Sequence, residues 1–207
     1  MDTSVGKFNP RDTFYRKAKE DGFRARSAYK LLDIQKKYRV IRRGDAVLDL
    51  GCAPGSWLQV LSDLVGEQGL VLGIDLLPTP ALPRKNVQAL VADIRTVSAP
   101  ELLASCSRPH FDVITCDIAP NLSGIRDVDN ARITDLYQAV RDIALKVLKP
   151  DGRFIIKSFF LEDFKQTRSE LENLFTRVTI YKPAASRGAS AEVYLVCEER
   201  KTVIGDQ

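Results

Sequence analysis

The sequence predicts an α/β protein in which a doubly wound, mostly parallel seven-stranded sheet ends in an antiparallel C-terminal hairpin. Short apolar runs alternate with segments of helical periodicity after Gly44, which is typical of a βαβ arrangement. The early runs are almost continuously apolar, as expected for strands that helices cover on both faces. A long loop rich in Ser, Ala, Gly and Arg joins the last two runs, so these two could pair as a hairpin.

The order of the elements predicts a single domain over residues 23–200, preceded by a partly ordered basic arm over residues 1–22 and followed by a short tail over 201–207. The first helix is predicted at Arg24–Tyr38, which has a mixed apolar face. The strands are expected at Ala46–Leu50, Leu70–Asp75, Val87–Ala92, Phe111–Asp117, Arg153–Lys157, Arg177–Tyr181 and Glu192–Cys197. The later helices are expected at Trp57–Val65, Ala99–Cys106, Asp129–Leu148 and Glu162–Phe175.

The bulk composition indicates a cytoplasmic globular protein. With 207 residues, of which 44% are hydrophobic, the chain can bury a substantial core. No apolar run approaches the roughly 20 residues that span a bilayer, and the N-terminus has no apolar signal region. Cys52, Cys106, Cys116 and Cys197 are widely separated, as expected for reduced core thiols. The lone His110 excludes His pairs and multi-His metal sites, and we expect no metal.

The most informative stretch is the turn Asp49-Leu-Gly-Cys-Ala-Pro-Gly-Ser-Trp57, which lies between a predicted strand and a predicted helix. Gly51 and Gly55 would let the backbone approach a ligand closely. A dinucleotide site needs Gly-x-Gly-x-x-Gly, whereas here Ala53 occupies the second glycine position and Pro54 lacks an N–H donor. A ligand without a pyrophosphate fits better, which makes S-adenosylmethionine the candidate and the chain a candidate methyltransferase.

Positive charge is concentrated near the N-terminus. Lys and Arg far outnumber Asp and Glu between Lys7 and Arg43, although the whole chain has a net charge of only +4. This density favours contact with RNA or DNA phosphates, while a solvated helix face remains the alternative. Aromatic residues are interleaved with the charges, which favours the nucleic-acid interpretation. They are Phe8, Phe14, Tyr15, Phe23 and Tyr29.

Carboxylates recur where consecutive strands end. In an open α/β sheet, ligands bind beyond these carboxyl ends. Asp49 lies near the end of the first strand, Asp75 ends the second, and Asp93 follows the third. Asp75 could accept both hydroxyls of a ribose, and Asp93 could accept from an adenine amino group. Each of them alone could instead cap a turn, so their recurrence is the stronger signal.

Two further polar residues end later strands. Asp117 ends the fourth, and Lys157 ends the fifth, in Arg153-Phe-Ile-Ile-Lys157. A lysine at the end of a buried strand is unusual, although its stem could lie on the core while its ammonium group reaches solvent. Beside Asp117, Lys157 would be held charged and oriented.

Together these motifs resemble the FtsJ (RrmJ/RlmE) family of RNA 2′-O-ribose methyltransferases. They occur in family order from about residue 11 to residue 198, which is nearly the whole chain. Beside the glycine turn, the matching motifs are Arg26-Ser-Ala-Tyr-Lys-Leu-Leu32, Asp75-Leu-Leu-Pro78, Asp117-Ile-Ala-Pro-Asn-Leu-Ser-Gly124, Phe154-Ile-Ile-Lys157, Ser186-Arg187 and Glu192-Val-Tyr194. The resemblance implies a Rossmann-like, class I S-adenosylmethionine-dependent methyltransferase fold.

The resemblance also implies the roles of individual residues. The family carries a Lys-Asp-Lys-Glu catalytic tetrad, which corresponds here to Lys30, Asp117, Lys157 and Glu192. From the sequence alone, Lys30 and Glu192 would not stand out. The cofactor contacts expected from the resemblance and from the turn are Asp49, Gly51, Pro54, Gly55, Trp57, Asp75, Asp93 and Asp117. The residues expected to bind RNA are Arg24, Arg26, Lys30, Ser186 and Arg187.

Two departures from the family pattern stand near these motifs. Ser56 replaces a glycine found in many members, and Phe159-Phe160 follow the catalytic lysine motif, where other residues are common. The first change should be mild, whereas the second could alter the acceptor pocket.

The expected reaction is in-line attack of a ribose 2′-hydroxyl on the sulfonium methyl group. Lys157 would act as a neutral base or would stabilise negative charge on the oxygen, and residue type does not decide between these roles. The favoured substrate is a uridine of large-subunit ribosomal RNA, and a tRNA anticodon loop is the alternative. A methyltransferase acting on small molecules or proteins and a non-enzymatic RNA-binding assembly factor are the other hypotheses.

Overall fold

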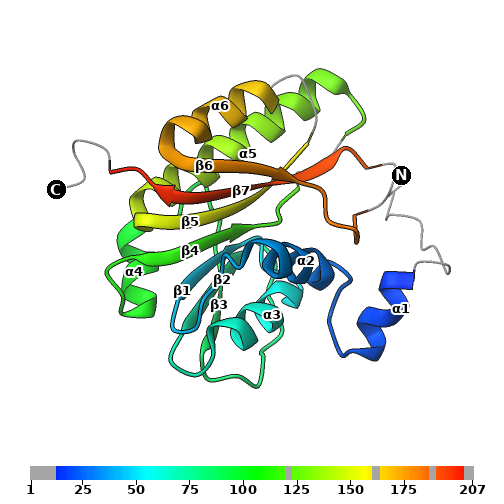
Figure 1. Cartoon of the computed structure of the whole chain (residues 1–207), viewed down its shortest axis with the longest axis vertical. Coiled ribbons are helices and arrows are strands. Elements are labelled where there is room, and N and C mark those ends of the chain that lie inside the picture. The colour runs from blue at the N-terminus through cyan, green and yellow to red at the C-terminus, as the bar shows by residue number, and fades with distance from the viewer. Residues whose placement is uncertain (1–12, 120–122, 160–163, 187–189, 203–207) are drawn as a thin grey trace.

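The computed structural model describes residues 13–119, 123–159, 164–186 and 190–202, and within them a seven-stranded sheet lies between two layers of helices (Figure 1). The strand order is β3-β2-β1-β4-β5-β7-β6. The strands are β1 (Ala46–Leu50), β2 (Leu70–Asp75), β3 (Val87–Val91), β4 (Phe111–Cys116), β5 (Leu148–Phe159), β6 (Phe175–Tyr181) and β7 (Glu192–Arg200). The helices are α1 (Thr13–Glu20), α2 (Ala28–Tyr38), α3 (Ser56–Val65), α4 (Ala99–Cys106), α5 (Arg126–Val147) and α6 (Phe164–Leu174).

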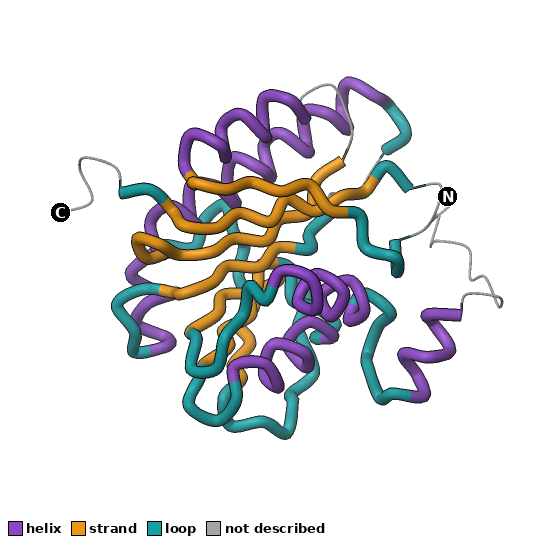
Figure 2. The backbone as a smooth tube through the Cα atoms, in the orientation of Figure 1, coloured by secondary structure: helices purple, strands orange, loops and turns teal. Residues whose placement is uncertain are grey.

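The pairing directions confirm the predicted mixed sheet. β3, β2, β1, β4 and β5 are parallel, and β7 lies antiparallel to both β5 and β6. The C-terminal hairpin therefore enters the sheet through β7, which separates β5 from β6. Figure 2 shows the strands as one continuous orange layer with helices on either side. This arrangement brings the first residue of β7 beside the last residue of β5, where Glu192 pairs with Phe159.

Alternating side chains of the strands build two apolar cores. In β1, Leu48 and Leu50 join the core beneath α4, α5 and α6, whereas Val47 joins the core beneath α2 and α3. Successive strand side chains point to opposite faces, so this strand, apolar except for Asp49, supplies both cores. All five residues of β1 are buried, which explains why this run lacks the polar alternation of a half-exposed strand.

The helix predicted at Arg24–Tyr38 begins later, at Ala28. Tertiary hydrogen bonds hold residue 24 outside the helix: its backbone N–H donates to Gln59 Oε1 at 2.9 Å, and its guanidinium group donates to carbonyls of distant loops. These long-range bonds override the helical periodicity that the sequence shows locally.

The described part of the basic arm contains a helix, α1, rather than irregular chain. Ala18 of α1 is buried, and the Phe14 ring lies 5.7 Å from the Tyr29 ring of α2. Tyr29 also meets Phe23 edge-on at 5.6 Å, and its hydroxyl donates to Asp21. This small third core fixes α1 against α2. Residues 1–12 of the arm and residues 203–207 of the tail lie outside the described residues.

Several element boundaries differ from the predicted ones. Phe175 begins β6 instead of ending a helix, and β5 runs from Leu148 to Phe159, well beyond the predicted Arg153–Lys157. The register of β4 against β5 shifts between Phe111 and Val113, so the longer strand accommodates extra residues that its neighbour lacks. The start predicted for the last helix, Glu162, lies outside the described residues. Of the helices in the described part of the chain, none has the length and apolar character that a membrane crossing requires.

Candidate active site

The four residues of the implied tetrad come together at the carboxyl edge of the sheet. Lys30 lies on α2, Asp117 directly follows β4, Lys157 lies in β5, and Glu192 begins β7. Lys30 Nζ lies 2.8 Å from Glu192 Oε1 and 3.9 Å from Asp117 Oδ1, and Lys157 Nζ lies 3.2 Å from Asp117 Oδ1. The structure thus alternates two cations and two carboxylates, and it pairs Lys30 with a residue 162 positions away in the chain.

The tetrad is largely withdrawn from solvent. The side chains of Lys30, Asp117, Lys157 and Glu192 are only 7–16% exposed. Burial of charges is costly unless they are paired, and here each charge lies within 4 Å of an opposite charge. Lys157 Nζ also donates to the backbone carbonyl of Asp117 at 2.6 Å, which fixes the position of its ammonium group.

A buried tyrosine, Tyr194, contacts two residues of the tetrad. The Tyr194 hydroxyl donates to Asp117 Oδ1, and its ring lies 5.7 Å from Lys30 Nζ and stacks on Trp57 with ring centroids 6.0 Å apart. Burial and the carboxylates of Asp117 and Glu192 raise the pKa of Tyr194 well above its usual value, so the hydroxyl remains a donor. The sequence motifs did not predict this role, although Tyr194 follows Glu192 by two residues and therefore faces the same side of β7.

A second group of predicted residues surrounds a pocket of about 440 Å³ beside the tetrad. Gly51, Asp75 and Asp93 line this pocket, which we call the donor pocket. The remaining lining residues are Ile74, Leu76, Ala92, Ile94, Arg95, Ile118, Ala119, Arg132, Asp135 and Leu136. The carboxyl ends of β1, β2 and β3 thus contribute to one cavity, as expected at the edge of a parallel sheet.

The carboxylates of the donor pocket already have partners within the protein. Asp75 Oδ2 accepts from the Ala53 N–H and Oδ1 from the Leu77 N–H, each at 2.9 Å. Asp93 pairs with Arg95 at 2.8 Å, and the hydrogen bonds from Arg95 lower the pKa of Asp93. Asp75 keeps further lone pairs for a ligand hydroxyl. Both oxygens of Asp93 already accept from the backbone N–H and the guanidinium group of Arg95, so a ligand amino group would replace one of these contacts.

Asp49, also expected at the cofactor, is fully buried and is not among the residues that line the donor pocket. Thr115 Oγ1 donates to Asp49 Oδ1 at 2.6 Å, and Asp49 Oδ2 has no hydrogen-bond partner among the described residues. Burial, together with the carboxylates of Asp117 and Asp75, raises the pKa of Asp49 to about 8 against the opposing effect of the Thr115 hydrogen bond. Asp49 is therefore held mostly neutral at pH 7, and its buried side chain does not contribute a charge to the pocket.

The glycine turn approaches its neighbours too closely for a larger residue. A Cβ atom on Gly51, whose φ is +78°, would lie 2.2 Å from Ile118 Cγ1. A Cβ atom on Gly55, whose φ is +101°, would lie 2.6 Å from Arg24 Nη1. Both positions therefore require glycine for its left-handed backbone and for its missing side chain.

Arg24, predicted to bind RNA, uses its guanidinium group on the protein itself. Nη1 donates to the carbonyls of Pro54 and Pro80 at 3.0 and 2.7 Å, and Nη2 donates to the Ala81 carbonyl at 2.9 Å. A guanidinium group has five N–H donors, so these three bonds leave two donors for other partners. Arg24 thereby joins the glycine turn to the loop after β2.

Other residues that were predicted to contact the cofactor or RNA bond mainly within the protein. Trp57 is 3% exposed, and its Nε1 donates to the Ser27 carbonyl at 2.9 Å, which places the indole ring in the core rather than in the donor pocket. Arg26 Nη2 donates to the Ala185 carbonyl at 2.6 Å, and Ser186 Oγ donates to Glu192 Oε1 at 2.9 Å. Ser186 thus touches the tetrad itself. Arg187 lies outside the described residues.

Replacing Asp49 with asparagine tests the raised pKa. An unfolded aspartate has a pKa of about 3.9, so the stability contributed by protonated Asp49 is complete below about pH 4 and is lost as the pH rises through about 8. Asparagine cannot ionise. The decrease in the free energy of unfolding between pH 5 and pH 9, measured by urea denaturation, should therefore be smaller in Asp49→Asn by more than about 1.4 kcal/mol. Asp63→Asn, at a side chain that is 62% exposed, is the control, and identical pH profiles for Asp49→Asn and wild type would contradict the assignment.

Comparison with known proteins identifies the family. The family described as FtsJ-like methyltransferase matches residues 23–200. Ribosomal RNA large subunit methyltransferase E of Methanothermobacter thermautotrophicus is 42% identical over 191 residues, which cover 92% of this chain and 90% of that protein. The protein of the same name from Bdellovibrio bacteriovorus is 40% identical over 195 residues, 94% of this chain and 99% of that protein.

Solved structures agree with this result. A crystal structure described as a ribosomal RNA methyltransferase from Plasmodium falciparum superimposes with a TM-score of 0.78 at 25% identity, covering 87% of this chain and 100% of that chain. The fibrillarin/Nop5p complex, with a TM-score of 0.58 at 21% identity over 80% of this chain and 78% of that chain, shares the fold alone. Sequence and structure lead to one conclusion: the chain belongs to the FtsJ-like methyltransferase family and is an RNA methyltransferase.

Proposed function

We propose that this protein methylates the 2′-hydroxyl of a uridine ribose in large-subunit ribosomal RNA, with S-adenosylmethionine as the methyl donor. The observation that carries the proposal is the cluster of Lys30, Asp117, Lys157 and Glu192 next to the donor pocket. The relatives named for the ribosomal large subunit favour this RNA over a tRNA anticodon loop. A paired, buried tetrad also favours an enzyme over a non-enzymatic assembly factor, which would not need it.

The donor pocket suits S-adenosylmethionine, which the family implies. This donor supplies a methyl group already activated by a positively charged sulfonium. Asp75 would accept the ribose hydroxyls of the donor, and Asp93 would accept from its adenine amino group. Gly51 keeps the turn close to the cavity wall, and the negative charge of Asp75, which lines the pocket, attracts the sulfonium. Pro54 and Gly55 belong to the same turn but do not line the pocket. Their backbone groups bond within the protein, so we assign them to shaping the turn.

Lys157 is the group that we assign to the acceptor oxygen. An ammonium group has three N–H donors, and one of them donates to the Asp117 backbone carbonyl at 2.6 Å, while the ion pair with Asp117 Oδ1 at 3.2 Å orients the group. As an ammonium, Lys157 directs another N–H at the 2′-oxygen and stabilises its developing negative charge while the proton passes to water. As a neutral amine, Lys157 directs its lone pair at the same point and accepts the proton. Lys30 and Glu192 hold Asp117 and the neighbouring surface in place, and the remaining rate gain comes from positioning.

The RNA would lie across α1, α2 and the start of β7. Arg16 and Lys19 on α1 are exposed, and the aromatic core around Tyr29 fixes this helix against α2, which carries Lys30. Arg26 and Ser186 hold the segment before β7 next to the tetrad. Phosphate contacts of this kind orient the RNA while the target ribose reaches Lys157.

Loss of the Lys157 ammonium group should abolish catalysis without unfolding the protein. We expect Lys157→Ala to retain its fold and donor binding, with some loss of thermal stability because Asp117 loses its nearer cation. The variant should lower kcat by about a thousandfold or more, since it removes the group assigned to the acceptor oxygen. The measurement is transfer of labelled methyl groups to ribosomal RNA, with the modified nucleotide mapped in RNA from cells with and without the protein. Near-normal turnover in Lys157→Ala would refute the assignment. Absence of any labelled ribose with the wild-type protein would refute the function itself.

Arg24 should matter more for donor binding than for RNA binding. Arg24→Ala removes three hydrogen bonds that join Pro54 to the loop at Pro80 and Ala81, and we expect the Kd for S-adenosylmethionine to rise about five- to fiftyfold. Titration calorimetry measures this Kd, and filter binding measures the Kd for RNA. Arg16→Ala is the matched control and should leave donor binding unchanged. An unchanged donor Kd combined with weakened RNA binding would assign Arg24 to the RNA.

The exposed charges of α1 should carry part of the RNA affinity. Removing Arg16 and Lys19 together should weaken RNA binding and reduce the slope of log K against log salt by about 0.7–0.9 for each phosphate that these side chains neutralise. Lys146→Ala, at an exposed position on α5 in the opposite helix layer, is the control. A slope that stays the same in the α1 variant would exclude α1 from the interface.

A further inference from the structure

We propose that a second cavity, between α5, β5 and α6, receives the pyrimidine base of the nucleotide whose ribose is methylated. We call it the base pocket, and the inference rests on the proposed function. The cavity has a volume of about 120 Å³ and includes Lys157 in its wall. The other lining residues are Cys116, Ile118, Asn130, Ile133, Thr134, Leu136, Tyr137, Gln138, Val140, Ile156, Ser158, Phe159, Phe164, Gln166, Thr167 and Glu170.

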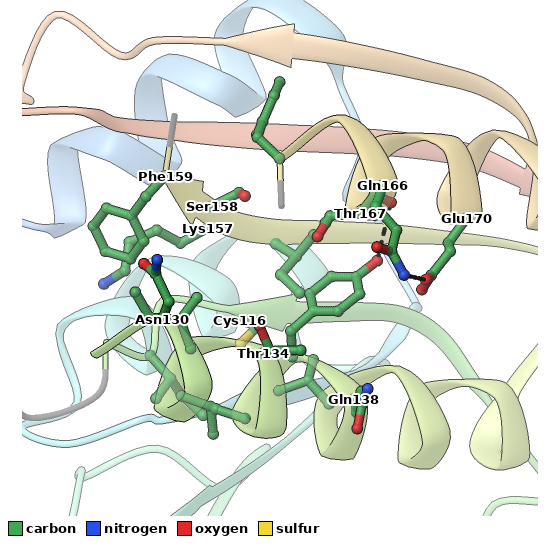
Figure 3. A pocket seen from close by; sticks show the side chains of 17 residues that line it. Cys116, Asn130, Thr134, Gln138, Lys157, Ser158, Phe159, Gln166, Thr167 and Glu170 are labelled. Atoms are coloured by element: carbon green, nitrogen blue, oxygen red, sulfur yellow. Dashed lines mark hydrogen bonds between the residues drawn. The ribbon is translucent and has the colours of Figure 1, made fainter. Parts of the chain in front are cut away.

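The position of the base pocket suits the acceptor nucleotide. Ile118 and Leu136 line both the donor pocket and the base pocket, so the two cavities are neighbours that share a wall. Lys157 lines only the base pocket, where Figure 3 shows its side chain at the same end as Asn130 and Phe159. A ribose held at Lys157 can therefore place its base in one cavity while the donor occupies the other.

The charges around the base pocket exclude a phosphate as its occupant. Its charged lining residues are Lys157 and Glu170. Lys157 pairs with Asp117, and Glu170 accepts from Arg141 at 2.8 Å and from Gln166 at 3.1 Å at the opposite end of the cavity. The one cation among these described residues, Lys157, is paired with Asp117 and assigned to the 2′-oxygen, so a phosphate would compete for it, whereas a neutral ring would leave both ion pairs intact.

The polar groups that remain suit the edge of a base. Among the described residues, neither the Asn130 amide nor the Ser158 hydroxyl has a hydrogen-bond partner, although both side chains are half-buried. An amide offers a donor and an acceptor side by side, which matches the alternating carbonyl and N–H groups of a pyrimidine edge. Such half-buried, unpaired groups favour a ligand that completes their hydrogen bonds.

The remaining walls suit the flat faces of the base. Phe159 supplies an aromatic ring at the same end of the cavity as Asn130 (Figure 3), and Ile118, Ile133 and Ile156 supply aliphatic surface. Aromatic side chains bind unstacked bases through their π faces. The cavity, about 120 Å³ in volume, has room for a flat ring. The paired donor and acceptor of the Asn130 amide, rather than the volume, favour a pyrimidine as that ring.

A double-mutant cycle between the protein and the RNA tests the inference. One RNA carries the mapped target nucleotide, and a second RNA carries an abasic ribonucleotide there, which keeps the 2′-hydroxyl. For the wild-type protein, we expect removal of the base to lower kcat/KM about ten- to a hundredfold. For Asn130→Ala and Phe159→Leu, removal of the base should cost about threefold or less, because these variants no longer hold the base fully. Asn173→Ala, an exposed asparagine on α6 outside the cavity, should behave as wild type.

Three other outcomes would overturn the inference, and they are distinguishable. In the first outcome, the wild-type protein methylates RNA ribose, but removal of the base lowers kcat/KM by the same factor in Asn130→Ala, Phe159→Leu and wild type. The assignment of the base pocket is then wrong, while the proposed function stands. If adenosine at the target is methylated as fast as the pyrimidine, the pyrimidine assignment is wrong. If the wild-type protein transfers no methyl group to RNA ribose, the proposed function fails and this inference fails with it.

Discussion

The carboxylate of Asp117 lies between two lysine ammonium groups, and the rest of the site depends on this arrangement. Lys157 of β5 and Lys30 of α2 pair with this carboxylate, and the hydroxyl of the buried Tyr194, in β7, donates a hydrogen bond to it. The two ammonium groups would repel each other without the carboxylate between them, and the Asp117 carboxylate would be costly to bury without the two ammonium groups. Pairing lowers the cost of burying these charges, and the same contacts hold the Lys157 nitrogen in a fixed position at the edge of the sheet.

The carboxyl edge of the sheet carries two separate cavities, one for the methyl donor and one for the acceptor nucleotide. The carboxyl ends of β1, β2 and β3 surround the donor pocket, whereas β5 and helices α5 and α6 surround the base pocket. Ile118, directly after Asp117, belongs to both walls and also fills the space that the missing side chain of Gly51 leaves. Leu136 of α5 completes the wall that Ile118 forms between the two cavities.

The long-range contacts of the N-terminal segment explain where local reasoning fails. Along the chain, Arg24 is one more basic residue in a basic segment, and periodicity extends the helix through it. In the fold, its guanidinium group joins carbonyls that lie 30 to 57 positions away, which stops the helix and links the segment to the glycine turn. A long-range hydrogen bond also sets the position of Trp57. Its indole N–H donates to the Ser27 carbonyl, which holds the ring in the core.

The sequence by itself determined the sheet, the glycine turn and the recurring carboxylates, because strand hydrophobicity and turn chemistry are local properties that do not require knowledge of the partners. Its motifs also pointed to the four residues of the tetrad, although two of these carried no local signal. Only the tertiary structure decided that Lys30 pairs with Glu192 across 162 positions, that Arg24 binds carbonyls of the protein itself, and that Tyr194 completes the cluster. Those outcomes depend on distances between elements far apart in the chain, and these distances are set by how helices and strands pack rather than by any one segment.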